Sequence, residues 1–185
     1  MAAAKLRITG GSARGLPISE PRGLRLRPTS GLVREAIFNI LGDRVTSATV
    51  LDLFAGTGAL GIEALSRGAT RAVFIDAAQV SCQAILQTLA RAGFSGSAIV
   101  LRGRLPGALR NVSEQFDIVT MDPPYDSEAA EPTLVEIHEF VQPGGVVVYE
   151  HGSRYNPPER PAGLRLLERR VYGDSAIALY EHQEG

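Results

Sequence analysis

The chain has 185 residues, of which 44% are hydrophobic and 21% charged, a composition that is ordinary for a globular protein. Its single cysteine, Cys82, excludes an internal disulfide, and the three histidines show no metal-ligand spacing. No apolar run approaches the roughly 20 residues that a membrane-spanning helix needs. We therefore expect a cytoplasmic protein that binds no metal and no membrane, and nothing in the sequence demands more than a monomer.

Positive charge is concentrated near the N-terminus. Residues 1–44 hold eight basic and three acidic side chains, a net charge of +5, whereas the rest of the chain carries −6. A basic segment on an acidic body is typical of proteins with a phosphate-rich partner, although a solvated arginine-rich surface explains the charge equally well. We expect residues 1–44 to form a basic, RNA-binding arm with a helix that packs on a main domain of residues 45–185.

The first expected elements are short. Lys5–Thr9 and Leu16–Ser19 flank a glycine-rich loop, which predicts a hairpin. A helix is expected next, with Thr29 or Ser30 as its N-cap and its end at about Leu41, because apolar residues recur there at helical spacing.

Strands and helices then alternate along the chain. Strands are expected at Thr49–Phe54, Ala72–Asp76, Ala98–Leu101, Phe116–Met121 and Gly145–Glu150. Helices are expected between them at Ala59–Arg67, Gln79–Ala92, Leu105–Val112 and Ala129–Phe140. This alternation predicts an α/β fold with a parallel sheet and right-handed crossovers. Leu164–Tyr172 and Ser175–His182 predict an antiparallel hairpin that completes a seven-stranded, Rossmann-like sheet.

A glycine-rich turn follows the first strand of this pattern. Gly56 to Gly61 reads Gly-x-Gly-x-x-Gly at a strand-to-helix junction, where open α/β sheets bind ligands, and Asp76 ends the next strand in a position to hold ribose hydroxyls. The same spacing occurs in nicotinamide-dinucleotide enzymes. Asp52, just before the turn, favours S-adenosylmethionine instead, because its carboxylate can receive the ammonium group of that cofactor. A pyrophosphate would gain nothing from this negative charge.

The second motif is Asp122-Pro123-Pro124-Tyr125, directly after the strand Phe116–Met121 and therefore at the same sheet edge as the glycine turn. The exocyclic amino group of a nucleobase is a poor nucleophile, because its lone pair is delocalised into the ring. The Asp122 carboxylate and the Pro123 carbonyl, held rigid by consecutive prolines, are two acceptors that can steer this group toward tetrahedral geometry. Tyr125 can stack on the extruded base. The arrangement indicates methyl transfer to an amino nitrogen by alignment and charge stabilisation, without a strong general base.

The chain resembles the RsmD family. The shared stretches are Arg7-Ile8-Thr9-Gly10-Gly11, Arg14-Gly15, Arg27-Pro28-Thr29, Val33–Asn39, Leu51–Gly68, Asp122–Tyr125 and Val171–Asp174. The N-terminal arm is the most specific part of the resemblance, because the glycine turn and the Asp122–Tyr125 motif are shared by many amino-methyltransferases. The family methylates N2 of a guanine in 16S ribosomal RNA on a class I methyltransferase fold. The resemblance therefore implies S-adenosylmethionine as cofactor, S-adenosylhomocysteine as product, and the small ribosomal subunit or its assembly intermediate as partner.

The resemblance also implies roles for individual residues. The residues expected to hold the guanine amino group are Asp122, Pro123, Pro124 and Tyr125. Those expected to hold the cofactor are Asp52, Phe54, Gly56, Gly58 and Asp76. The residues expected near the mouth of the site are Arg27, Thr29 and Arg34, with Arg7 and Arg14 toward RNA.

Two positions depart from the family pattern. Ala78 replaces an acid that often follows the ribose-binding carboxylate, and Arg104 stands where such enzymes often carry Asp or Asn against the adenine amino group. Guanine offers N1–H and N2–H to a carboxylate, but one oxygen can also serve adenine N6. An adenine-N6 methyltransferase acting on DNA or another RNA therefore stays open, as do a dehydrogenase that uses the glycine turn and an RNA-binding assembly factor without activity.

Overall fold

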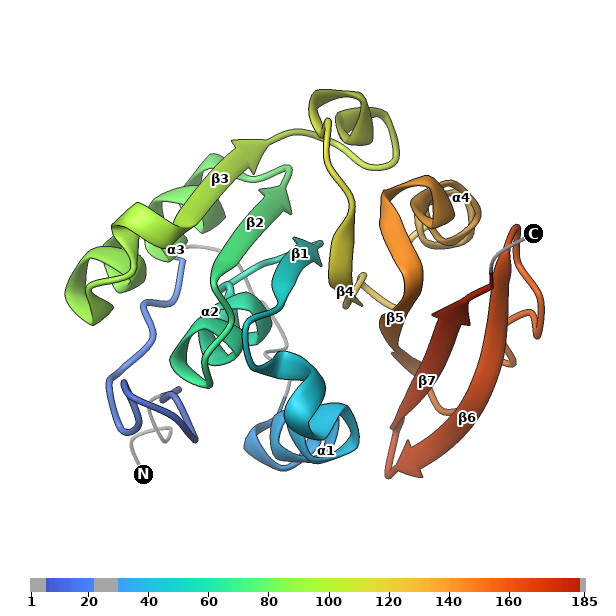
Figure 1. Ribbon diagram of the computed structural model, residues 1–185, viewed down its shortest axis with the longest axis horizontal. Helices are drawn as coiled ribbons and strands as arrows, with labels where there is room; N and C mark the ends of the chain where they lie inside the picture. Colours follow the sequence, from blue (N-terminus) through green and yellow to red (C-terminus); the bar gives the residue numbers. More distant parts are fainter. Residues whose placement is uncertain (1–5, 22–29, 184–185) are drawn as a thin grey trace.

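The computed structural model describes residues 6–21 and 30–183 and contains a seven-stranded sheet (Figure 1). The strands are β1 (Thr49–Leu53), β2 (Arg71–Asp76), β3 (Ala98–Arg102), β4 (Phe116–Met121), β5 (Val141–Gly152), β6 (Leu164–Tyr172) and β7 (Ser175–His182). The α-helices are α1 (Gly31–Leu41), α2 (Ala59–Ser66), α3 (Gln79–Ala92) and α4 (Ala130–Glu136). Short 3-10 helices are η1 (Gly42–Val45), η2 (Ser95–Ser97), η3 (Gly107–Asn111) and η4 (Ile137–Phe140). In this part of the chain no helix is long and apolar enough to cross a membrane.

The strand order is β3-β2-β1-β4-β5-β7-β6, with β7 antiparallel to both of its neighbours and the other pairings parallel. This confirms the predicted α/β sheet and its closing hairpin. The chain leaves β1 toward β2 and later returns to β4 on the other side of β1. The sheet therefore has its switch point between β1 and β4, whose carboxyl ends are level because Leu53 pairs with Met121. Ligands of open α/β sheets bind at this point.

Two apolar layers cover the sheet. The arm and helices α1, α2 and α3 pack on one face, against side chains such as Val50, Ile118 and Val148. Helix α4 and the 3-10 helices η3 and η4 pack on the other face, against Leu51 and Val119 among others. Because side chains alternate along β1, Asp52 lies on the same face of the sheet as Val50, and its carboxylate contacts α2 beside the switch point.

Local signals explain several element boundaries. Helix α1 begins where the sequence predicts, because the Ser30 side chain accepts a hydrogen bond from the Val33 backbone N–H at 3.1 Å. It ends at Gly42, which has a positive φ of 53°. Helix α3 and the β6–β7 hairpin have the expected bounds.

Two expectations were wrong in detail. The segment Leu105–Val112 forms only the 3-10 helix η3, because Pro106 disfavours a helical conformation at Leu105 and Gly107 is a poor helix former. The helix expected at Ala129–Phe140 is divided into α4 and η4. The expected N-terminal hairpin is present: Arg7 forms an antiparallel bridge with Pro17, and the Ile8 N–H donates to the Leu16 carbonyl at 3.0 Å and the Ile18 N–H to the Leu6 carbonyl at 2.9 Å.

Candidate active site

A cavity of about 660 Å³ opens at the switch point. Its volume is typical of cofactor and small-molecule sites. The lining residues that the sequence singles out come from both motifs: Asp52, Phe54, Gly56, Asp76, Arg104, Asp122, Pro123, Pro124 and Tyr125. The structure thus brings the glycine turn and the Asp-Pro-Pro-Tyr loop to one cavity, as their positions after β1 and β4 predict.

The glycines of the turn serve different purposes. Gly56 lines the cavity and has a φ of 56°, a conformation in which glycine avoids the steric cost of a side chain. Gly58 lies outside the lining and begins α2. A Cβ there would lie 2.9 Å from Ile85 Cγ1, so its absence lets the turn pack on α3. Phe54 also has a positive φ, 54°, which is unusual for a bulky residue and marks local strain at the cavity wall.

Asp76 fixes the turn to the end of β2. One of its oxygens accepts a hydrogen bond from the Gly56 N–H and the other from the Ala78 N–H, both at 2.8 Å. Each carboxylate oxygen has a second lone pair, so Asp76 retains acceptor capacity toward the cavity. This geometry suits a pair of ribose hydroxyls.

Asp52 is a buried carboxyl at the floor of the cavity, with a side chain that is 1% exposed. It accepts hydrogen bonds from the Gly61 N–H at 3.0 Å and from the Thr120 hydroxyl at 2.8 Å. Burial raises the pKa of Asp52 to about 7, and the two hydrogen bonds only partly offset this. A buried carboxylate with so high a pKa would be stabilised by a cation in the cavity. Thr120 was missed by the sequence reasoning, although strand alternation beside Asp52 places it on the same face.

The Asp122–Tyr125 loop is hydrogen-bonded to β1 and to β7. The Asp122 N–H donates to the Leu53 carbonyl at 3.4 Å, which holds the loop beside the end of β1. Pro123 is buried, whereas Tyr125 is 45% exposed. The Tyr125 hydroxyl lies 2.6 Å from the Ser175 hydroxyl on β7. Ser175 lines the cavity too, and no local sequence signal connects it with a loop 50 residues earlier.

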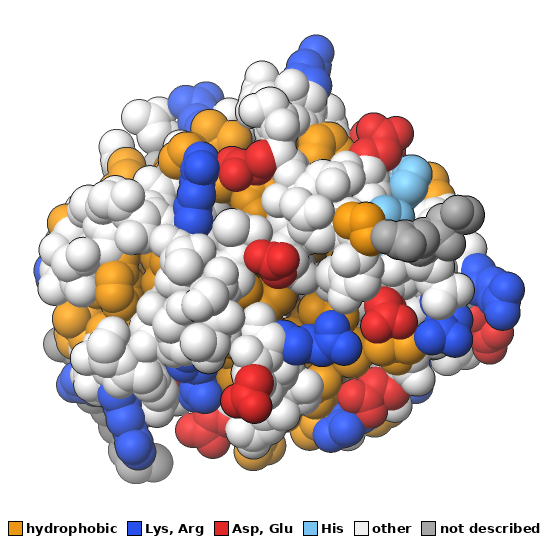
Figure 2. All heavy atoms as spheres, viewed as in Figure 1, with side chains coloured by type: hydrophobic (Ala, Val, Ile, Leu, Met, Phe, Trp, Pro, Cys, Tyr) orange, Lys and Arg blue, Asp and Glu red, His pale blue; other side chains and the backbone are white. Residues whose placement is uncertain are grey.

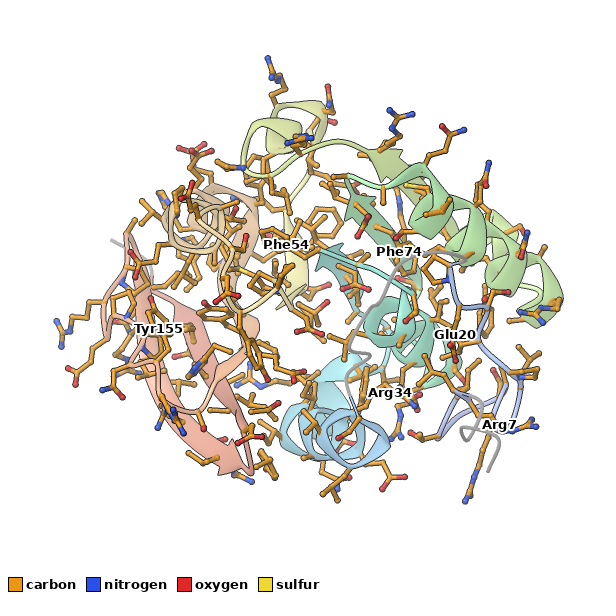
Figure 3. The ribbon with its side chains drawn as sticks, turned by 180° about the vertical axis from the view of Figure 1, so that it is seen from behind. Arg7, Glu20, Arg34, Phe54, Phe74 and Tyr155 are labelled. Atoms are coloured by element: carbon orange, nitrogen blue, oxygen red, sulfur yellow. The ribbon has the colours of Figure 1, made fainter. Side chains whose placement is uncertain are left out.

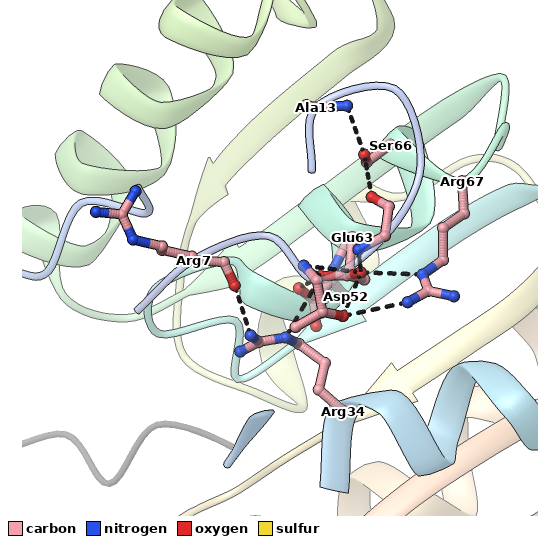
Figure 4. Close-up of polar contacts among 10 residues, drawn as sticks. Arg7, Ala13, Arg34, Asp52, Glu63, Ser66 and Arg67 are labelled. Atoms are coloured by element: carbon pink, nitrogen blue, oxygen red, sulfur yellow. Dashed lines mark hydrogen bonds and ion pairs between the residues drawn. The ribbon is translucent and has the colours of Figure 1, made fainter. Parts of the chain in front are cut away.

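Arg34 corrects an expectation. It was expected near the mouth of the site as an RNA contact, but its side chain is 1% exposed and lies between α1 and the arm (Figures 3 and 4). Its Nε lies 3.4 Å from a Glu63 carboxylate oxygen, and its Nη2 donates to the Arg7 carbonyl at 2.7 Å. A guanidinium held this way in the interior serves the fold, because it cannot reach an RNA phosphate.

The centre of this polar cluster is Glu63 of α2, which is fully buried (Figure 4). Its carboxylate accepts from the Thr9 N–H and hydroxyl and from the Gly10 N–H, and it pairs with Arg67 at 2.9 Å. Because three of these bonds come from the arm, Glu63 fastens the arm to α2. No local sequence pattern indicates this role for Glu63.

The arm joins the far end of α2. The Ala13 N–H donates to the Ser66 hydroxyl at 2.9 Å, and a Cβ on Gly11 would lie 1.8 Å from the Ser66 carbonyl oxygen, so only glycine fits there. The cavity, by contrast, adjoins the first turn of α2. Arg14 is exposed and follows Ala13 at the Ser66 end of α2, and the two ends of this helix are about 12 Å apart.

Arg7 and Arg14 are the other predicted arginines among the described residues, and both are exposed. Arg7 is exposed on the arm, where its guanidinium donates to the Gly15 carbonyl at 2.7 Å (Figure 3). On the face seen in Figure 2, basic and acidic side chains are interspersed. Arg27 and Thr29 lie outside the described residues. The predictions that Arg7 and Arg14 contact RNA stay predictions.

Comparison with known proteins decides the family. The family model described as "Conserved hypothetical protein 95" matches residues 6–181. The chain belongs to this family. It is 34% identical over 181 residues to "Ribosomal RNA small subunit methyltransferase D" of Escherichia coli, covering 97% of this chain and 91% of that protein. These matches confirm the resemblance to the RsmD family.

Solved structures confirm the fold. The yhhF protein of Escherichia coli superposes with a TM-score of 0.85 at 32% identity, covering 98% of this chain and all of that one. TrmN from Thermus thermophilus shares the fold with a TM-score of 0.70 at 21% identity, over 85% of this chain and 51% of that one. This chain therefore has the class I S-adenosylmethionine-dependent methyltransferase fold that its sequence predicts.

Proposed function

We propose that this protein transfers a methyl group from S-adenosylmethionine to the exocyclic N2 of a guanine in 16S ribosomal RNA. One observation carries the proposal: a buried carboxyl suited to a cationic cofactor, Asp52, and the Asp122–Tyr125 loop line the same cavity. A relative that is 34% identical over nearly the whole chain is named as a small-subunit ribosomal RNA methyltransferase, which supports RNA as the substrate.

The residues of the cavity fit the proposed cofactor. Asp52 offers a buried negative charge for the methionine ammonium group, and Asp76 offers acceptors for the ribose hydroxyls. Gly56 lines the cavity and has no side chain, which lets the backbone approach a ligand closely. Arg104 lines the cavity after β3, where it borders the expected adenine position. When bound, S-adenosylmethionine supplies an activated methyl group on a sulfonium.

The chain's own residues orient the acceptor nitrogen. The Asp122 carboxylate and the Pro123 carbonyl would accept hydrogen bonds from the two N–H groups of an exocyclic amine and so direct its lone pair into the cavity. Both are held in place, because the Asp122 N–H is bonded to Leu53 and the two prolines restrict the backbone. As the nitrogen becomes cationic, the carboxylate stabilises the developing charge. The nitrogen then loses a proton, to Asp122 or to water.

Tyr125 would stack on the face of the base, since its ring is partly exposed at the cavity and stacking on an aromatic ring favours an extruded base. Guanine suits Asp122 through two adjacent donors, N1–H and N2–H. An adenine-N6 methyltransferase acting on DNA or another RNA would use the same geometry and is the alternative candidate.

The small ribosomal subunit, or an intermediate in its assembly, is the proposed partner. Arg7 and Arg14 are exposed on the arm and do not line the cavity, so they would contact phosphates at a distance from the target base. An arm of this size reads little sequence, so a substrate with a defined shape is favoured over a linear sequence motif.

The direct test is transfer of labelled methyl groups from S-adenosylmethionine to small subunits isolated from a strain that lacks this enzyme. We expect label in 16S ribosomal RNA with the wild-type protein and little with Asp122→Ala. Absence of label in a preparation that binds S-adenosylhomocysteine would contradict the substrate, and absence of binding would contradict the cofactor.

A further inference from the structure

Tyr125 borders open space on both sides. On one side lies the 660 Å³ cavity, and on the other a second cavity of about 790 Å³, which is also lined by Pro123, Pro124 and Tyr125. The second cavity reaches toward the buried rings of Tyr149 and His151 on β5. A ring placed between two cavities has room to turn away from a base that it should stack on.

The backbone restrains this ring only in part. The consecutive prolines fix the chain before Tyr125, and the Ser127 N–H closes a turn onto the Pro124 carbonyl at 2.9 Å. Neither contact restricts rotation about the Tyr125 Cα–Cβ bond, whose staggered positions are separated by about 120°. Such a rotation would move the ring from the first cavity toward the second.

Ser175 is a rigid point of attachment for the ring. It begins β7 and pairs with Gly152 of β5 on one side and with Tyr172 of β6 on the other, so its backbone is held by both neighbouring strands. Its side chain is 6% exposed, and its hydroxyl lies 2.6 Å from the Tyr125 hydroxyl, within the normal range of an O–H···O bond. Gly152 lies beside the same ring: a Cβ there would be 3.7 Å from Tyr125 Cδ2.

We propose that Ser175 is a positioning residue that holds the Tyr125 ring at the first cavity in the orientation needed to stack on the target base. This inference rests on the proposed function, and it extends the site to the β6–β7 hairpin. The hairpin thereby contributes to the orientation of the base, while Asp122 and Pro123 orient its amino group. Because the interaction joins one hydroxyl to another, removing either hydroxyl should have the same effect.

The kinetic test compares Ser175→Ala, Tyr125→Phe and the double variant in methyl transfer to small subunits. Each single variant should lower kcat about fivefold, as expected for one net hydrogen bond, and the double variant should be no slower than either. The affinity for S-adenosylhomocysteine should stay unchanged. Ser175→Thr, which keeps a hydroxyl, should restore most of the rate. Ser153→Ala is the matched control: it removes a serine hydroxyl next to Gly152, outside the first cavity, and should leave kcat unchanged.

A second measurement tests the same inference without methyl transfer. In protein labelled with 3-fluorotyrosine, the Tyr125 resonance is assigned by its loss in Tyr125→Phe. This resonance should shift and sharpen in Ser175→Ala and stay unchanged in Ser153→Ala. A resonance that Ser175→Ala does not change would overturn the proposal, as would additive losses of kcat. A wild-type protein that transfers no methyl group, but whose resonance responds as expected, would contradict the proposed function alone.

Discussion

Lowering the pH below 7 is expected to weaken cofactor binding through Asp52. In the free protein, burial raises the pKa of this carboxyl to about 7, so much of it is protonated in mildly acidic solution. An ammonium group in the cavity would stabilise the carboxylate, and binding below pH 7 must therefore release a proton. With a pKa of about 7, roughly half of Asp52 is ionised at pH 7.0 and only about 3% at pH 5.5. The dissociation constant for S-adenosylhomocysteine should consequently rise about 16-fold over this range.

Isothermal titration calorimetry measures this linkage directly. Titrations at pH 6.0 in buffers of different ionisation enthalpy should show about 0.9 proton released for each S-adenosylhomocysteine bound. The range below pH 7 is chosen because the amino group of the ligand stays charged there. The control is Asp52→Asn, which can keep the bonds to Gly61 and Thr120 but cannot ionise, and which should bind weakly with no pH dependence. A wild-type affinity that is flat between pH 5.5 and 7.0, without proton release, would refute the assigned role of Asp52.

Four further predictions concern stability, turnover and RNA binding. Because burial raises the folded-state pKa of Asp52 from 3.8, the folded protein loses stability as the pH rises through about 7. At pH 8, the free energy of unfolding of Asp52→Asn, measured with urea, should therefore exceed that of wild type by up to about 4 kcal/mol. This difference should vanish near pH 4. Asp122→Ala should lower kcat at least ~100-fold with an unchanged dissociation constant for S-adenosylhomocysteine; a parallel loss of binding would contradict its role toward the base. Glu63→Ala should lower the free energy of unfolding by about 3–5 kcal/mol, because it leaves Arg34 buried without the Glu63 carboxylate. Adding Arg34→Met should restore much of this stability. Equal stability of all three proteins would show that the buried pair does not hold the arm. Arg14→Ala should reduce the slope of log binding constant against log salt by about 1, and an unchanged slope would remove this arginine from the RNA interface.

Much of the fold follows from local patterns in the sequence. The period of the apolar residues and the cap at Ser30 predict α1, and the Gly173-Asp174 turn between two strand-like runs predicts the β6–β7 hairpin. The cofactor side of the site can also be predicted from the sequence. Asp52 and Asp76 lie at the carboxyl ends of neighbouring parallel strands, and such ends meet at one edge of the sheet.

Pairings between distant elements explain what the sequence could not reveal. Arg34 reads as one more arginine of a basic segment, and only the packing of α1 against α2 shows that it is buried beside Glu63, 29 residues later. The contact of Ser175 with Tyr125 likewise joins the first residue of β7 to a loop 50 residues earlier, and no periodicity connects the two. The segment Leu105–Val112 has apolar residues at helical spacing, but the proline and glycine at its start outweigh that pattern.

Identification of the methylated nucleoside tests the central claim most directly. Small subunits from a strain that lacks the enzyme would be incubated with the protein and labelled S-adenosylmethionine, and the purified 16S ribosomal RNA digested to nucleosides and separated. The account predicts label in N2-methylguanosine, and none with Asp122→Ala. Label in N6-methyladenosine would keep the geometry of amino-group methylation and contradict guanine as the target.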